Sequence, residues 1–286
     1  MTQDKYVVIL FYKFTPIADP KAFADVHRLK CIELSLTGRL IVAEEGINGT
    51  FEGVQENIDA YKSFLQNDPL FSDILIKEST GTGAAFPKLK IKVRDEVVTL
   101  GAGRFDVQKE TATELSAQEL EKWYEDDKDF VVLDLRNDYE IASGKFEKTI
   151  DPGLANFRDL PKKLDQLKEL KNKKVVTVCT GGIRCEKATC LLKKEGFTDV
   201  YQLKDGIHTY MKEYPGKNFK GTLFVFDNRL TTDVVPTPGK VIAGKCIYCS
   251  GPTEDYYSDD SERPCRKVLC CESCFMSQGK ALRSIK

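Results

Sequence analysis

The feature that most constrains the fold is an apolar run that ends on a cysteine and is followed by two glycines and an arginine, within Lys173–Cys185. The β-branched residues of the run predict a buried strand ending at Cys179, and a helix is expected from Arg184 to Glu195, with Gly196 just beyond its end. Backbone N–H groups of such a strand-to-helix loop point inward, and the positive end of the helix lies beneath them. We therefore expect a cradle that stabilises an anion at Cys179 and makes its thiol acidic.

The loop resembles the active loop of the rhodanese family, in which a cysteine carries sulfur as a persulfide. It consists of Cys179, Thr180, Gly181, Gly182, Ile183, Arg184 and Cys185. Cysteine phosphatases enclose one more residue between cysteine and arginine and usually place a histidine before the cysteine, where this chain has Val178, so phosphate fits poorly. The plain alternative is a buried structural cysteine at a strand end. Cys185 either closes a disulfide with Cys179 or faces the helix interior.

The order of predicted elements divides the 286 residues into three parts. Residues 1–100 give the order βαββαβ, which predicts a ferredoxin-like α+β sandwich with an antiparallel sheet. The elements expected there are strands at Tyr6–Phe14, Leu40–Ala43, Thr50–Phe51, Asp73–Lys77 and Lys88–Leu100, and helices at Pro20–Leu34 and Val54–Gln66. Residues 112–216 alternate strands and helices, which predicts a doubly wound α/β sheet, the rhodanese-type domain. Residues 217–286 form a small extension rich in cysteine.

Cationic residues alternate with apolar ones along one predicted strand of the first domain. Lys88, Lys90, Lys92 and Arg94 share one face, while Leu89, Ile91 and Val93 are expected to pack inward. Residues two apart on a strand are separated by roughly 6.6 Å, which is close to the spacing of phosphates along a nucleic-acid strand. The row therefore predicts either contact with RNA phosphates or a solvated sheet edge protected by lysine.

Two further patterns have both a structural and a functional interpretation. Asn48-Gly49, within Glu45–Thr50, is a hairpin signal and predicts a turn when taken alone. Asp134 and Arg136 end a predicted buried parallel strand, at the edge of the sheet where Cys179 is also expected, and ligands of such sheets lie at this edge. The pair either fixes the loop after its strand as a structural ion pair or supports the active site.

The C-terminal extension contains two Cys-x2-Cys pairs, Cys246/Cys249 and Cys271/Cys274. This spacing is typical of a tetrathiolate zinc site, and a bound metal would supply the folding free energy that so small and polar a segment cannot obtain from apolar burial. Cys265 and Cys270 lie nearby and leave the ligand set open. The alternatives to zinc are an iron–sulfur cluster or free thiols.

Composition restricts where the protein works and what it binds. The net charge of −1 gives no overall preference for nucleic acid, so basic surface must be sought locally. The first residues lack the pattern of a signal peptide, and the apolar run Tyr6–Tyr12 is too short to span a membrane. We expect a cytoplasmic protein without membrane contact, whose cysteines are reactive or metal-bound.

Taken together, four motifs resemble those of the rhodanese-like tRNA uridine(34) hydroxylase family over nearly the whole chain. In order they are Glu45–Thr50, Cys179–Ala188, Phe224–Arg229 and the paired cysteines of the tail. The resemblance implies oxygen-dependent hydroxylation at C5 of the wobble uridine, in the anticodon loop of certain tRNAs, with Cys179 as the required residue and 5-hydroxyuridine as the product. One departure concerns the pocket wall: Lys204-Asp205-Gly206 lacks a second glycine that is common in rhodanese domains.

The residues do not predict how oxygen is activated. His27 and His208 are the two histidines and fall in different predicted domains, which argues against an iron site built from two histidines and a carboxylate; we expect both to be structural. No flavin fingerprint or haem motif is found. Molecular oxygen is the expected co-substrate, with a sulfur or electron donor as a further partner. One hypothesis is that Cys179, as thiolate, persulfide or oxidised sulfur, adds to C6 of the uracil and makes C5 nucleophilic. The alternative function is a sulfurtransferase that moves persulfide sulfur to an acceptor.

Overall fold

The computed structural model describes residues 5–261, 265–278 and 281–285. By its internal contacts the chain forms two compact units, residues 1–99 and 100–286. Among the described residues, no helix combines the length and the apolar composition that are needed to cross a membrane.

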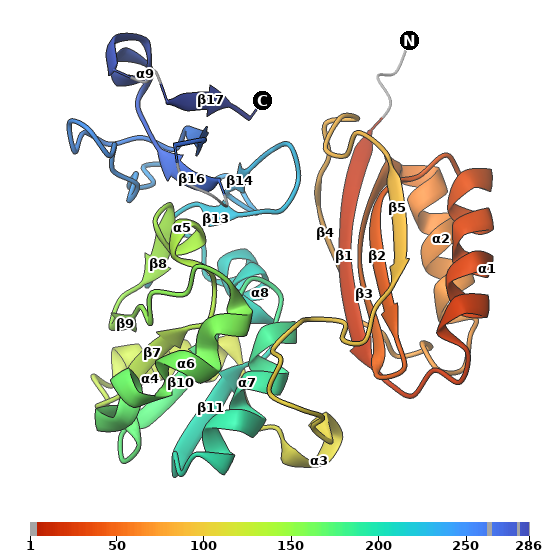
Figure 1. Cartoon of the computed structure of the whole chain (residues 1–286), viewed down its shortest axis with the longest axis horizontal. Helices are drawn as coiled ribbons and strands as arrows, with labels where there is room; N and C mark the ends of the chain where they lie inside the picture. Colours follow the sequence, from red (N-terminus) through yellow and green to blue (C-terminus); the bar gives the residue numbers. More distant parts are fainter. Residues whose placement is uncertain (1–4, 262–264, 279–280, 286) are drawn as a thin grey trace. The chain divides into compact units, whose positions relative to one another are not determined.

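The first unit is a five-stranded sheet with two helices on one of its faces (Figure 1). Its elements are β1 (Tyr6–Phe14), α1 (Pro20–Glu33), β2 (Thr37–Ala43), β3 (Gly46–Val54), α2 (Gln55–Gln66), β4 (Ile76–Thr80) and β5 (Leu89–Val93). The strand order is β4-β1-β3-β2-β5. The predicted ferredoxin-like sandwich is confirmed, with one difference: β5 is added at the edge and runs parallel to β2, while the other pairs are antiparallel.

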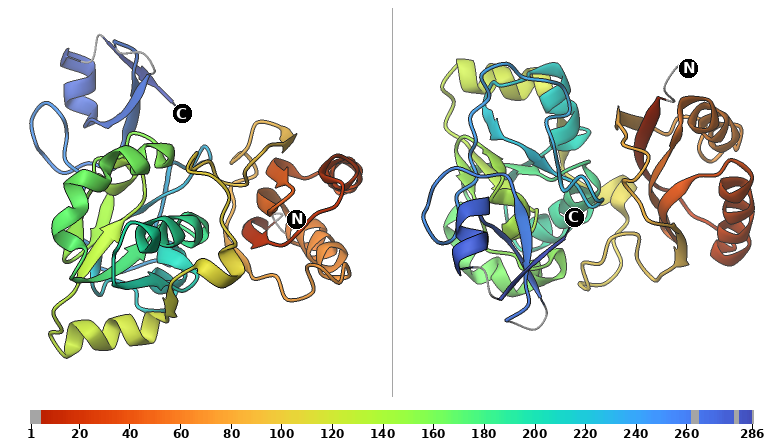
Figure 2. Two further views of the ribbon diagram at one scale, coloured as in Figure 1. Left: turned by 60° about the horizontal axis from the view of Figure 1, so that its bottom comes forward. Right: turned by 90° about the horizontal axis from the view of Figure 1, so that it is seen from above.

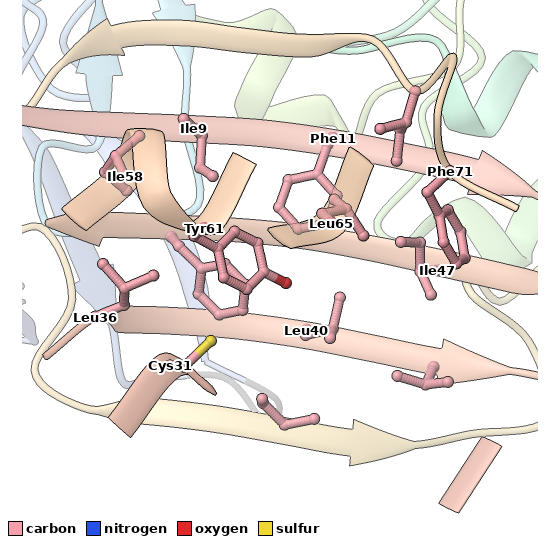
Figure 3. Packing of buried hydrophobic residues seen from close by; sticks show 14 of the residues in the cluster. Ile9, Phe11, Cys31, Leu36, Leu40, Ile47, Ile58, Tyr61, Leu65 and Phe71 are labelled. Atoms are coloured by element: carbon pink, nitrogen blue, oxygen red, sulfur yellow. The ribbon is translucent and has the colours of Figure 1, made fainter. Parts of the chain in front are cut away.

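Large apolar side chains between the sheet and the two helices hold this unit together (Figure 3). Phe11 and Phe51 from the sheet meet the ring of Tyr61 from α2, and all three are fully buried. Burying a side chain of this kind stabilises a fold by about 1.5–3 kcal/mol. His27 of α1 is buried too, and its Nδ1 lies 2.9 Å from the Tyr61 hydroxyl, which places it in the core as a structural residue.

The prediction of a turn at Asn48-Gly49 is wrong, because both residues lie inside β3. The chain turns instead at Glu44–Glu45, between β2 and β3. Gly49 is a packing glycine: a Cβ at this position would lie 2.4 Å from the Phe11 ring. Asn48 and Glu45 both bind the backbone of Val97. The Asn48 side-chain amide donates to the Val97 carbonyl at 3.1 Å, and the Val97 N–H donates to the Glu45 carboxylate at 2.8 Å. The motif therefore fastens the segment that follows β5.

The second unit contains a parallel sheet with helices on both faces, as expected for a doubly wound fold (Figure 2). Its strand order is β6-β11-β10-β7-β9. The strands are β6 (Thr113–Leu115), β7 (Val131–Asp134), β9 (Thr149–Ile150), β10 (Lys174–Val178) and β11 (Asp199–Leu203). The helices and turns between them are α3 (Val107–Glu110), α4 (Ala117–Glu125), α5 (Asp138–Ile141), η1 (Phe157–Asp159), α6 (Leu160–Lys163), η2 (Leu164–Leu170), α7 (Ile183–Lys194) and α8 (Gly206–Glu213).

Side chains from α4 and α8 form one core of this unit with the strands. Leu120 of α4 and Ile207 of α8 belong to the same buried cluster as Val132, Val176 and Val178. A capping box starts α4, with the Ser116 and Glu119 side chains each accepting from the other's backbone N–H.

The C-terminal part packs back onto the parallel sheet unit. Its elements are β12 (Phe219–Gly221), β13 (Leu223–Phe224), β14 (Thr231–Thr232), β15 (Tyr256–Asp259), β16 (Arg266–Leu269), α9 (Glu272–Gln278) and β17 (Leu282–Ser284). β12 pairs with β8 (Gly144–Phe146), and the hydroxyl of Tyr256 donates to the carbonyl of Tyr139 on α5. α5 is consequently held between the parallel sheet and this extension.

Candidate functional site

The Cys179 loop lies at the carboxyl end of β10, in the centre of the parallel sheet. Cys179 follows the last residue of β10, and Gly182, with φ of 107°, leads directly into α7. The N–H of Gly182 donates to the Cys179 sulfur at 3.1 Å. The loop is therefore folded as the sequence predicts, with backbone N–H groups turned inward around the sulfur at the start of a helix.

The start of α8 supports this loop through backbone hydrogen bonds. The N–H of Ile207 donates to the carbonyl of Cys179, and that of His208 to the carbonyl of Thr180, both at 3.0 Å. Gly206 makes this approach feasible, because a Cβ there would lie 2.7 Å from the Cys179 carbonyl oxygen. The preceding Asp205, at the position that departs from the common rhodanese pattern, adopts φ of 61°, a left-handed conformation that aspartate tolerates. Asp205 therefore allows the same backbone turn at this position as the glycine that is common in rhodanese domains.

Arg184 is held by a carboxylate that the sequence analysis did not single out. Glu140 of α5 is fully buried and binds the Arg184 guanidinium in a bidentate pair, at 2.7 and 2.9 Å. The Thr180 hydroxyl lies 3.1 Å from the same guanidinium. A sequence signal for Glu140 exists: Asn137-x-x-Glu140 is a capping box that starts α5 directly after β7, at the sheet edge where Cys179 lies.

The surroundings of Cys179 favour its thiolate. Burial raises the pKa of Cys179, but the hydrogen bond from the Cys185 thiol, the charge of Arg184 and the backbone N–H groups of Arg184 and Cys185 together lower it to about 5. Burial and the adjacent Cys179 sulfur hold the pKa of Cys185 well above its ordinary range. Cys185 is therefore a buried thiol that donates to Cys179.

This low pKa also couples the thiolate to stability. A thiol in an unfolded chain has a pKa of about 8.5, so the folded protein gains stability from the ionised Cys179 above that pH. The gain is lost as the pH falls towards about 5, where the folded-state thiolate takes up a proton.

Asp134 and Arg136 form a buried pair behind the site. Arg136 binds both carboxylate oxygens of Asp134, and its guanidinium also donates to the carbonyls of Glu140 (3.3 Å) and Gly144 (2.7 Å). These contacts tie the loop after β7 to Glu140 of α5 and to the first residue of β8. The pair thereby positions the helix that carries Glu140.

A ring from the C-terminal part reaches the loop as well. Phe226, in the motif that follows β13, places its ring centroid 5.9 Å from the guanidinium carbon of Arg184. Asp227 and Arg229 of the same motif form a bidentate pair at 2.8 and 2.6 Å. The sequence motif Phe224–Arg229 is thus part of the surroundings of the Cys179 loop.

The two predicted Cys-x2-Cys pairs come together in a single cluster. The sulfur atoms of Cys246, Cys249, Cys271 and Cys274 all lie within 4.8 Å of one another, and those of Cys249 and Cys271 are 3.7 Å apart. Four thiolates at about 2.3 Å from a tetrahedral ion are separated by about 3.8 Å. These four cysteines can therefore hold a metal ion. Cys265 and Cys270 are not among these four: Cys265 is exposed, and the Cys270 thiol donates to the Cys271 carbonyl at 3.4 Å, although its sulfur also lies 4.0 Å from that of Cys246.

The basic row lies on the exposed face of the edge strand β5. Ile91 is buried and Leu89 half-buried, as expected, but Val93 is 42% exposed because it ends an edge strand that has a neighbour on one side only. The four cations predicted to share a face are all solvent-accessible: Lys88, Lys90, Lys92 and Arg94. This row belongs to the first unit, whereas Cys179 belongs to the second.

Comparisons with known families agree with this architecture. Residues 6–97 match the UPF0176 acylphosphatase like domain, residues 116–213 the rhodanese-like domain, and residues 220–283 the rhodanase C-terminal family. The fold and the cysteine loop of the second unit thus define a rhodanese-type protein.

Relatives that span nearly the whole chain narrow the class to one family. A protein of Cytophaga hutchinsonii is 41% identical over 94% of this chain and 86% of its own length, and one of Onion yellows phytoplasma is 42% identical over 95% and 90%. A Staphylococcus aureus protein is 41% identical over 93% and 85%. All three are named tRNA uridine(34) hydroxylase. The chain belongs to the tRNA uridine(34) hydroxylase family.

The buried Arg184–Glu140 pair generates a prediction about stability. Replacing Glu140 with Gln removes the carboxylate that pairs with the buried guanidinium, and breaking a buried pair in this way costs about 3–5 kcal/mol. We expect Glu140→Gln to lower the free energy of unfolding by about 3 kcal/mol in urea denaturation. Glu147→Gln is the matched control, because that carboxylate is 53% exposed and pairs with Lys220 at the surface. Equal losses of stability in the two variants would contradict the role of burial.

Proposed function

We propose that this protein hydroxylates the wobble uridine of tRNA at C5, giving 5-hydroxyuridine, with dioxygen as co-substrate and Cys179 as the reacting residue. The observation that carries the proposal is its relation, at about 41% identity over 94% of the chain, to a protein named for this activity. The cradle at Cys179 supports it, because a thiol with a pKa of about 5 is a thiolate at neutral pH and so a competent nucleophile. A tRNA substrate would place the protein in the cytoplasm.

In the proposed reaction the Cys179 thiolate adds to C6 of the uracil. The π-electron pair of the C5=C6 double bond moves towards C5, which becomes the nucleophile that takes up oxygen. One atom of dioxygen ends as the hydroxyl on C5 and the other in water; an external donor supplies two electrons, solvent supplies two protons overall, and loss of the C5 proton with departure of the Cys179 thiolate restores the C5=C6 double bond. Cys185 donates its hydrogen bond to the departing thiolate, and Arg184 stabilises the same negative charge.

The buried position of Cys179 fits a base that is turned out of its stack. Its side chain is fully buried, so the surroundings of the Cys179 loop would have to open for any base to reach the sulfur, and a uridine held in a paired helix could not enter. Unpaired bases of an RNA loop can be splayed out and bound individually. The anticodon loop offers the wobble uridine in this form.

We also propose that the basic row on β5 contacts tRNA phosphates. Lys88, Lys90, Lys92 and Arg94 are accessible along one edge, and their alternation repeats at the spacing of a nucleic-acid backbone. Such contacts would position the RNA without reading its sequence.

We further propose zinc as the ion of the four-cysteine cluster. Four cysteine sulfurs with tetrahedral spacing are the donor set of structural zinc sites. The ion would tie the segment around Cys246 to α9 and stabilise the extension that presents Phe226.

The function is tested by nucleoside mass spectrometry of tRNA from a strain that lacks the gene. Loss of 5-hydroxyuridine derivatives, restored by the wild-type gene but not by Cys179→Ser, is the expected result, because a serine hydroxyl does not ionise near neutral pH. Cys185→Ser is the matched control and should cost less activity, since its hydroxyl can still donate to Cys179. Loss of thiolated nucleosides instead would identify a sulfurtransferase, and wild-type levels of 5-hydroxyuridine with Cys179→Ser would refute the catalytic assignment.

For the cysteine cluster we expect one zinc ion per chain. Elemental analysis of protein purified without chelator measures it, and Cys249→Ser should reduce the zinc content strongly whereas Cys265→Ser should leave it unchanged. Iron and visible colour in place of zinc would instead indicate an iron–sulfur cluster.

For the basic row we expect an effect on binding alone. The double variant Lys90→Gln, Lys92→Gln should bind all tRNAs more weakly and make log K less steep in log salt by about 0.7–0.9 for each phosphate that is no longer neutralised. Because both side chains point to solvent, the free energy of unfolding should change by less than about 0.5 kcal/mol. Lys21→Gln, an exposed lysine on α1, serves as the control. An unaltered salt slope in the double variant would show that the row is only a solvated edge.

A further inference from the structure

Phe226 is an exposed aromatic ring held beside the catalytic loop. Phe226 is 41% exposed, whereas Phe224, two residues earlier, is fully buried. The ring of Phe226 meets that of Phe224 edge-on at 5.4 Å between centroids, and the guanidinium carbon of Arg184 lies 5.9 Å from its centroid. The ring is thus packed on Phe224 and beside Arg184 of the Cys179 loop, and part of the residue remains accessible.

The segment that presents Phe226 is fixed by its neighbours. The buried Asp227 is bound twice by Arg229, and the N–H of Leu230 donates to the Asp227 carbonyl at 3.0 Å. On the other side, the N–H of Val225 donates to the Leu230 carbonyl at 2.8 Å. Below the ring, Phe224 packs against Tyr139 and Tyr256. A ring on such a support needs little ordering when it binds a flat partner, because its position is already set.

Arg184 does not account for the exposure of this ring. Its guanidinium is already bound by the two oxygens of Glu140 and by Thr180, so its charge is compensated without Phe226. A ring that served only to bury Arg184 would be expected to lie covered, as Phe224 does. A partly exposed ring on a rigid support beside the Cys179 loop is instead suited to stacking, since every base offers a flat π face.

We propose that Phe226 is the platform on which the target uracil stacks when it reaches Cys179. The proposal rests on the proposed function and adds to it the residue that captures the base. Stacking on an aromatic side chain changes affinity by about 5- to 150-fold per base when the ring is removed. Phe226 is accordingly a positioning residue that touches the base, whereas the Cys179 loop carries out the chemistry.

The test compares two RNA hairpins of the anticodon stem and loop, one with uridine and one with an abasic residue at position 34. For the wild-type protein we expect the uridine hairpin to bind about tenfold more tightly than the abasic one. In Phe226→Leu, which keeps apolar bulk without the π face, this ratio should fall close to one. Phe226→Tyr should restore it. Phe105→Leu is the matched control, because it removes a ring that lies beside a different cation, Lys194. This variant should leave the ratio unchanged.

The inference and the proposed function fail in different ways. A Phe226→Leu protein that keeps the wild-type ratio, or that loses affinity for both hairpins equally, would overturn the stacking role even if the strain experiment still shows 5-hydroxyuridine. Binding of the hairpins does not depend on product, so an inactive protein with the expected ratios would retain the stacking role while the proposed reaction fails. A thermal unfolding curve of Phe226→Leu like that of the wild type confirms that its loss of binding is local.

Discussion

The chemistry of the site depends on a negative charge held at the sulfur of a buried cysteine. Burial opposes this charge, and three kinds of interaction overcome the opposition: inward backbone N–H groups, the Cys185 thiol and the guanidinium of Arg184. Each of these groups comes from the loop or the first turn of α7, so the strand, the loop and the helix together stabilise the thiolate. The remainder of the second unit keeps Arg184 and this loop in place.

Support for Arg184 comes from parts of the chain that are distant in sequence. Glu140 pairs with the guanidinium, the Asp134–Arg136 pair fixes the helix that carries Glu140, and the extension packs on that same helix through Tyr256. The start of α8 binds the loop carbonyls from below. The extension therefore contributes directly to the site, and the proposed zinc ion and the stacking ring would both act through it.

Local sequence patterns predict the Cys179 loop, but they do not predict the residues distant in sequence that contact it. The strand, the glycines and the helix start are all encoded within Lys173–Cys185, and the spacing of the paired cysteines indicates their cluster. Glu140 is separated from Arg184 by 44 positions along the chain, and only the parallel pairing of β7 with β10 brings them together. The prediction of a turn at Asn48-Gly49 is wrong because close packing of Gly49 on Phe11 overrides a strong dipeptide propensity. Tertiary packing, which a single sequence does not display, decides both the Glu140–Arg184 pairing and the position of the turn before β3.

The pKa of Cys179 in the folded protein can be measured directly. Carbon-13 NMR of the cysteine Cβ, with Cys179→Ser used to assign the signal, follows the ionisation of this one thiol against pH. We predict a midpoint near pH 5. A midpoint near 8.5, about the value of an ordinary thiol, would contradict the anion cradle, because the loop would then hold no negative charge at neutral pH.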